Sequence, residues 1–212
     1  MAAREAESEK ERSQYAYRQT VSFIEIQPRG GLFKEVREVI FLPGGERSER
    51  TVGRPADSLA RLKLTPEDHA DLRDIQPLLL TPEMLPRYEI RYRGEETLDG
   101  VVCWALEVKP RQVFQGQRYF EGRLWAAQED FGVARMEGQA VPPLYKKGTE
   151  NLFPRFTTFR ERIDGKHWFP VLTFADDTLP FKGGGQRIRL EVRYEQYKRF
   201  GAESKITFEP PK

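Results

Sequence analysis

The stretch "QRIRLEVRYEQY", from Gln186 to Tyr197, alternates apolar and charged side chains at every second position. This period of two predicts a β-strand with one buried and one solvated face. At about 3.3 Å per residue such a strand would span roughly 35 Å, which is long for a strand in a globular domain. The fold therefore depends on what covers its dry face, which is made of Ile188, Leu190, Val192 and Tyr194.

The same alternation recurs along most of the chain. The segments "YAYRQTVSFIEIQ" and "FKEVREVIFLPGG" predict two long strands joined by a turn at Pro28–Gly31. Asp99-Gly100 and Asp164-Gly165 are typical two-residue hairpin turns, and a further turn is expected at Gln128–Asp130. In "HWFPVLTFAD" the expected core row is Trp168, Leu172 and Phe174.

Two segments depart from the strand pattern. Residues 1–14 are polar with no apolar stripe, so we expect a solvated tail or helix end. Residues 56–85 are expected to form a helical insertion lying across the sheet, because Thr65 is suited to an N-cap and Pro66 to the first helical position. The rest of 15–212 is expected to be a single domain.

These patterns predict a fold that is mostly β with a few helices. Two packed sheets would satisfy the apolar rows, and so would one curved antiparallel sheet, a half-barrel of about 9–11 strands wrapped around short helices. The second arrangement is preferred. Because the chain has so little helix, this arrangement leaves apolar volume on the concave face of the sheet, where a lipid could bind. The residues expected to line this cavity or the core are Tyr88, Ile90, Tyr92, Trp104, Leu106, Phe120, Leu124, Leu190 and Val192.

Composition argues against several classes of function. The net charge of +2 comes from 35 basic and 33 acidic residues that are mixed along the chain, so no nucleic-acid partner is expected. No window approaches 18 consecutive apolar residues, so no transmembrane segment is expected. The charged stretch "MAAREAESEKERS" has no apolar h-region, so we expect no signal peptide within these residues.

No catalytic or metal-binding pattern is visible. His69 and His167 have no metal-ligand spacing, and we expect His69 to be solvated and His167 to flank a turn. Cys103 lies in an apolar run, where a thiol is inert. The glycines Gly183–Gly185 precede a strand, whereas a phosphate-binding loop would open a helix. We therefore expect no enzyme, no metal and no cofactor; an enzyme with dispersed carboxylates is a third, less favoured hypothesis.

The order of strand ends and turns resembles a known family. The segments "YRGEETLDGVVCWALEVKPR", "GRLWAAQEDFGVARMEG", "FRERIDGKHWFPVLTF" and "LEVRYEQYKRFG" are similar to the outer-membrane lipoprotein-sorting proteins, the LolA/LolB-like group that includes RseB-like sensors. The similarity covers roughly residues 88–202. It implies an antiparallel half-barrel around helices, an apolar cavity for acyl chains, and a periplasmic location. It carries over no catalytic residue.

The expected function is therefore that of a non-enzymatic periplasmic carrier or sensor. Its partner would be a lipid or the acyl chain of a lipoprotein, and a membrane-associated protein could be a further partner. The alternative is a protein-interaction or sensor module on the same scaffold with no lipid cargo. That alternative predicts a filled core with an exposed apolar patch or an open sheet edge.

Overall fold

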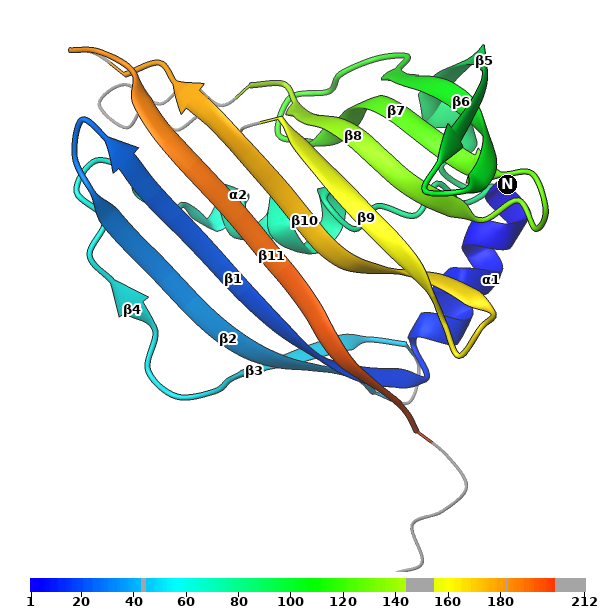
Figure 1. The fold of residues 1–212 in the computed structure, drawn as a ribbon, viewed down its shortest axis with the longest axis horizontal. Helices are drawn as coiled ribbons and strands as arrows, with labels where there is room; N and C mark the ends of the chain where they lie inside the picture. The colour runs from blue at the N-terminus through cyan, green and yellow to red at the C-terminus, as the bar shows by residue number, and fades with distance from the viewer. Residues whose placement is uncertain (43–44, 144–154, 182, 201–212) are drawn as a thin grey trace, which may run out of the picture.

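The computed structural model describes residues 1–42, 45–143, 155–181 and 183–200. Apart from two short helices and two single turns, the regular structure consists of strands (Figure 1). The elements, in chain order, are α1 (Ala2–Arg12), β1 (Tyr15–Gln27), β2 (Gly31–Phe41), β3 (Arg47–Thr51), β4 (Ala56–Asp57), α2 (Pro66–Ala70), a π-helical turn (Asp71–Ile75), a 3-10 turn (Leu85–Arg87), β5 (Tyr88–Leu98), β6 (Val101–Pro110), β7 (Tyr119–Ala127), β8 (Val133–Val141), β9 (Phe156–Ile163), β10 (His167–Leu179) and β11 (Gln186–Arg199).

The strands form one curved, open antiparallel sheet of eleven strands (Figure 1). Its order is β3-β2-β1-β11-β10-β9-β8-β7-β6-β5, and β4 pairs with β2 outside this path. Every strand from β5 to β11 pairs with its neighbour in sequence, and β11 closes against β1. The predicted half-barrel is therefore confirmed, with β3 and β5 as its two ends.

Strand β11 lies near the middle of the sheet, and its predicted alternation is confirmed. Its apolar positions from Ile188 to Tyr194 are at most 2% exposed, while Arg187, Arg189 and Arg193 are exposed. On one side β11 pairs Val192 with Val21 of β1, and on the other side it pairs the same residue with Thr173 of β10. The long strands on both sides satisfy the backbone hydrogen bonds of β11, and the segment around α2 covers its apolar face.

The segment around α2 covers the apolar face of the sheet. It runs behind the long strands in Figure 1 and buries Leu72, Ile75, Leu78 and Leu80 in the same hydrophobic cluster as β1 and β11. The predicted helix start is confirmed by a capping box at Thr65: its hydroxyl accepts from the Asp68 N–H, and the Asp68 carboxylate accepts from the Thr65 N–H.

Helix α1 is not a solvated helix end, so that prediction was wrong. Glu5 and Ser8 on one of its faces are each 1% exposed. Glu5 forms an ion pair with Arg160 of β9 in which Nη1 lies 2.9 Å from Oε2, and Arg160 also donates to the Leu78 carbonyl. Helix α1 has no apolar stripe, and a buried ion pair holds it to the sheet. Its burial could therefore not be predicted from hydrophobic patterning.

The predicted turns agree with the backbone. Asp99 and Gly100, and likewise Asp164 and Gly165, have the positive φ values of a type I′ hairpin turn. The sequence also predicts a turn at Pro43-Gly44-Gly45, at the end of "FKEVREVIFLPGG", and this turn lies largely outside the described residues. Gly183 and Gly184 lie in the connection to β11 and open no helix.

The core row predicted for β10 was wrong at its centre. Thr173 and Ala175 are the buried residues there, at 0% and 3% exposed, while Leu172 and Phe174 are only partly buried. A register shift between Pro170 and Leu172 changes the alternation at this point. This segment carries apolar residues on both faces, so its period could not identify the buried one.

Candidate functional site

Five of the nine residues predicted to line a cavity are packed into the hydrophobic core. Their exposed fractions are 2% or less, and all belong to one cluster with the residues of the α2 segment. A side chain facing a water-sized space would retain accessible surface, so these five side chains contact protein on all sides. They are Tyr88, Phe120, Leu124, Leu190 and Val192. Whether any of the nine contacts a ligand stays a prediction.

The other four lie together on the last two strands of the sheet. Ile90 and Tyr92 of β5 face Val108 and Leu106 of β6 in the strand register, and Trp104 follows two positions from Leu106. Ile90 and Leu106 pack against the core cluster from its edge, whereas Tyr92 is 60% exposed. These four side chains therefore extend the apolar face of the sheet from the core out to solvent.

Two more side chains complete this surface. Val102, which belongs to the same row of β6, is 47% exposed, and Phe131, in the β7–β8 turn, is 48% exposed. The rings of Trp104 and Phe131 have their centroids 5.2 Å apart. Phe131 has a φ of +61°, which is uncommon for a residue other than glycine. Its contact with Trp104 could not be predicted from the local sequence pattern. We call this surface the hairpin wall; it comprises Ile90, Tyr92, Val102, Trp104, Leu106 and Phe131.

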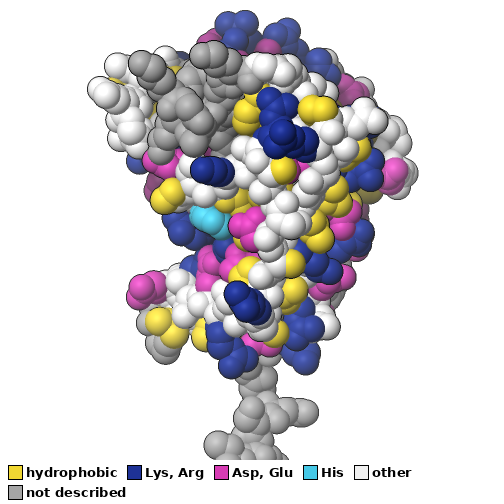
Figure 2. All heavy atoms as spheres, turned by 90° about the vertical axis from the view of Figure 1, so that its left-hand side faces the viewer, with side chains coloured by type: hydrophobic (Ala, Val, Ile, Leu, Met, Phe, Trp, Pro, Cys, Tyr) yellow, Lys and Arg dark blue, Asp and Glu magenta, His cyan; other side chains and the backbone are white. Residues whose placement is uncertain are grey.

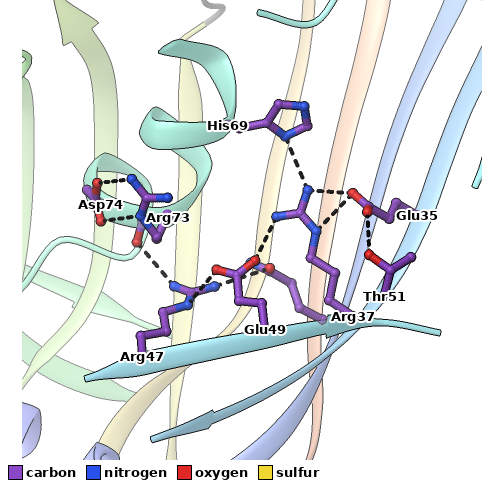
Figure 3. Close-up of polar contacts among 9 residues, drawn as sticks. Glu35, Arg37, Arg47, Glu49, Thr51, His69, Arg73 and Asp74 are labelled. Atoms are coloured by element: carbon purple, nitrogen blue, oxygen red, sulfur yellow. Dashed lines mark hydrogen bonds and ion pairs between the residues drawn. The ribbon is translucent and has the colours of Figure 1, made fainter. Parts of the chain in front are cut away.

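The opposite end of the sheet is charged on the face that the α2 segment covers. Alternation along β2 and β3 places Glu35, Arg37, Arg47, Glu49 and Thr51 on this face, pointing toward α2 and the π-helical turn (Figure 3). Figure 2 shows the end of the molecule where β4 and the β1–β2 turn lie, with acidic side chains gathered near its middle and basic side chains around them.

Arg37 is the centre of this charged cluster. It donates to Glu35, to Glu49 Oε2 at 3.0 Å, and its Nη2 lies 3.2 Å from His69 Nδ1 (Figure 3). Burial raises the pKa of Glu35, but the hydrogen bond and charge of Arg37 outweigh this and hold the pKa below its usual value. Burial lowers the pKa of His69, and the charge of Arg37 lowers it further. His69 is therefore a half-buried partner of Arg37, and the prediction of a solvated side chain was wrong.

The remaining chemical candidates carry no catalytic arrangement. Cys103 is fully buried, and burial raises the pKa of its thiol, as the apolar surroundings predicted. His167 is also buried and stacks on Phe169 with ring centroids 6.0 Å apart. In the part of the chain that the structure describes, no group of three His, Cys, Asp or Glu side chains could hold a metal ion. None of the described helices is long and apolar enough to span a bilayer.

Comparison with known proteins finds similarity at the level of solved structures. No family model matches the chain, and no curated protein does. A LolA superfamily protein from Nitrosomonas europaea is 14% identical, with a TM-score of 0.39, and the match covers 96% of this chain and 97% of that one. A putative outer membrane lipoprotein-sorting protein domain from Vibrio parahaemolyticus is 13% identical, with a TM-score of 0.42 and coverages of 94% and 93%.

A third similar structure is the MucA/MucB complex of Pseudomonas aeruginosa. The matched chain is 15% identical, with a TM-score of 0.26 and coverages of 95% and 99%. Two of these matches carry names from the lipoprotein-sorting group that the sequence resembles. At such low TM-scores and identities the matches supply no argument about ligand or partner, so the evidence for function lies in this chain's own residues.

Proposed function

We propose that this chain is a non-catalytic periplasmic binding protein that takes an acyl chain, of a lipid or of a lipoprotein, on the hairpin wall. The observation that carries the proposal is the continuity of the wall with the core. Its inner members, Ile90 and Leu106, pack against the buried cluster, and three of its outer members are about half exposed: Tyr92, Val102 and Phe131. Contiguous exposed apolar surface of this kind is typical of binding sites.

An acyl chain suits this wall chemically. The six side chains offer no charged group, and the Tyr92 hydroxyl is the only polar function besides the Trp104 N–H. Covering an exposed aromatic or large aliphatic side chain contributes roughly 1.5–3 kcal/mol each. Two or three such contacts contribute roughly 3–9 kcal/mol before the cost of association, so we expect binding weaker than micromolar. The proposed site is an open wall beside a packed core.

Uptake of a fluorescent fatty acid tests this proposal. The native chain should bind the probe saturably, and Tyr92→Ser and Val102→Ser should each weaken binding about tenfold, which corresponds to about 1.4 kcal/mol of lost contact. Ile24→Ser is the matched control, because Ile24 is also exposed, at 37%, but lies on β1 away from the wall. Absence of saturable uptake by the native chain, or equal weakening by the control, would contradict the proposal.

A second candidate is a protein-interaction module that uses the same wall. It is supported by the edge of β5, the last strand in the order of the described sheet, because an edge strand can pair with an extended protein segment. Peptides selected on the native chain from a displayed random library would distinguish the two functions. Apolar peptides whose binding is lost in Tyr92→Ser, together with no fatty-acid uptake, would favour the protein partner.

A further inference from the structure

A hollow of about 540 Å³ opens beside the charged cluster, at the other end of the sheet from the hairpin wall. Four segments that are distant in sequence supply its walls: the end of α1, the end of β2, β3 and the π-helical turn. Its volume lies within the range of roughly 300–1,000 Å³ that small-molecule sites occupy. The lining residues are Arg12, Phe41, Arg47, Glu49, Arg73 and Asp74.

The charges of this hollow do not balance. Glu49 is shared between Arg37, at 3.0 Å, and Arg47, whose Nε lies 2.8 Å from Oε1. Asp74 accepts from Arg73 with both carboxylate oxygens at 3.2 Å. Arg12 pairs with no carboxylate among the residues that the structure describes; its Nη1 reaches the Pro77 carbonyl at 3.5 Å. One guanidinium at the hollow therefore lacks a counter-charge.

The rest of the cluster does not supply the missing negative charge. Glu35 and Arg37 neutralise each other through their ion pair. His69 faces Arg37, and Asp68 on the same helix is engaged by Thr65 through the capping box. Of the groups that line the hollow or pair directly with its arginines, the arginines at positions 12, 37, 47 and 73 outnumber the carboxylates at 35, 49 and 74 by one, because the Asp68 carboxylate is turned to Thr65 instead.

Hydrogen-bond donors are also in excess at this place. Arg47 makes two long hydrogen bonds here (Figure 3). Its Nη1 lies 3.4 Å from the Arg73 carbonyl oxygen, and its Nη2 lies 3.4 Å from Gln19 Oε1. Arg12 Nε and Gln19 Nε2 are buried with no acceptor among the described protein groups. Buried donors are normally satisfied, so an acceptor-rich partner would complete the arrangement.

We propose that this hollow binds the oxyanion of an organic phosphate, with Arg12 and Arg47 as the main donors and Arg73 behind them. A guanidinium presents a planar fork of N–H donors that matches phosphate oxygens, and a phosphate can accept from two such forks at once. The hollow is larger than the anion, and Phe41 offers an apolar surface to the rest of the ligand. This inference does not depend on the function proposed for the hairpin wall.

Calorimetric titration of the full chain tests the site with two probes. One probe is glycerol 3-phosphate and the other is dihexanoyl phosphatidic acid below its micellar concentration. Both should bind saturably, and Arg12→Gln and Arg47→Gln should each weaken binding at least tenfold. Arg12 makes only a long contact to a carbonyl, so Arg12→Gln is the variant expected to leave folding intact.

Arg50→Gln is the matched control. Arg50 lies on β3 beside Glu49 but on the opposite face, where it is 78% exposed and pairs with Glu38. Binding within twofold of the native chain is expected for this variant. If neither probe binds, or if Arg50→Gln weakens binding as much as Arg12→Gln, the site is refuted. Tighter binding of the phosphatidic acid with the same arginine dependence would identify a lipid headgroup as the source of the phosphate, and equal affinity would identify a free phosphate ester.

Discussion

At the scale of single residues, the ion pair between Glu5 and Arg160 is the most deeply buried charge arrangement that the structure describes. The two side chains are 1% and 0% exposed, and Arg160 Nη1 contacts both carboxylate oxygens. Desolvating two charges costs several kcal/mol, and here the paired geometry and the Leu78 carbonyl offset that cost. The pair joins α1, the segment after α2 and β9 at one point.

Arg160→Met should lower the free energy of unfolding by about 3–5 kcal/mol, because it leaves the Glu5 carboxylate buried without a partner. Urea unfolding followed by circular dichroism measures this loss. The double variant Glu5→Leu with Arg160→Met should recover much of it, since no unpaired charge then remains buried. Glu7→Gln is the control: its ion pair with Arg4 is on the same helix but exposed, and it should cost at most about 1 kcal/mol. A loss for Arg160→Met no larger than that of Glu7→Gln would contradict this assignment.

A second buried carboxylate, that of Glu25, orders a loop by accepting hydrogen bonds from its backbone. Glu25 is 2% exposed and accepts from three consecutive backbone N–H groups, those of Ala60, Arg61 and Leu62, at 2.5–2.7 Å. It faces inward because it continues the buried row of β1. Sequence alternation predicts which way Glu25 points, but the loop that it orders is 35 residues away, and no local pattern connects the two.

At the scale of elements, β7 and β8 contain a pair of facing glycines. Gly122 and Gly138 are opposite each other in the strand register, and the ring of Phe120 lies over both. A Cβ atom on Gly138 would come within 2.7–2.8 Å of that ring and also collide with the Glu121 carbonyl. Glycine is required here so that an aromatic side chain can lie flat on the sheet.

Gly138→Ala should therefore destabilise the fold by about 1–3 kcal/mol, the usual cost of overpacking a core. The midpoint of urea unfolding gives the change. Gly30→Ala is the matched control, because the nearest atom to its added Cβ is 3.8 Å away, and its stability should change by less than about 1 kcal/mol. Equal stability of the two alanine variants would show that Phe120 moves aside without cost.

How far the sequence predicts each element depends on how its two faces differ. In β11 every outward position up to Arg193 is polar, so the period of two identified the strand, its length and its buried face. In β10 apolar residues occur on both faces and a bulge intervenes, so the same rule chose Leu172 and Phe174 wrongly. In α1 the buried face is made of Glu5 and Ser8, which hydrophobic patterning cannot detect.

The candidate sites follow the same logic. Tyr92 and Trp104 could be selected from strand alternation, but their exposure depends on the end of the sheet extending past the covering α2 segment, which is a tertiary property. Phe131 reaches the wall from a turn and was not predicted. The charged hollow was missed entirely, because it brings together α1, β3 and the π-helical turn, which are far apart in sequence.

At the scale of the whole molecule, the two proposed sites occupy the two ends of one sheet. The hairpin wall belongs to β5 and β6, and the charged hollow lies at β3, nine positions along the strand order from β5. Between them the long strands and the α2 segment form a packed core. The two proposals together predict that the chain binds an apolar and an anionic group at the same time, because the two sites share no residue.

The packed core also contains a cluster of tyrosines that makes overall stability depend on alkaline pH. The rings of Tyr15 and Tyr197 contact each other where β1 and β11 meet. Tyr194 lies on β11, just before Tyr197 in the sequence. Burial, aided by the hydrogen bond to Asp164, raises the pKa of Tyr15 to about 12, and burial raises the pKa of Tyr194 to about 12 as well. Burial also places the pKa of Tyr197 well above its usual value.

Between pH 10 and about 12 the folded chain therefore keeps phenolic protons that the unfolded chain has released. Stability falls with pH wherever the native state binds more protons, so each of these tyrosines should contribute a slope of up to about −1.4 kcal/mol per pH unit in this window and nothing well below it. Urea unfolding at stepped pH, with phenolate absorbance as a second signal, measures the slope. Tyr194→Phe should make it shallower, whereas Tyr92→Phe, at a position 60% exposed, should leave it unchanged. The same slope in Tyr194→Phe and in the native chain would show that this buried hydroxyl does not retain its proton, and that alkaline unfolding begins elsewhere.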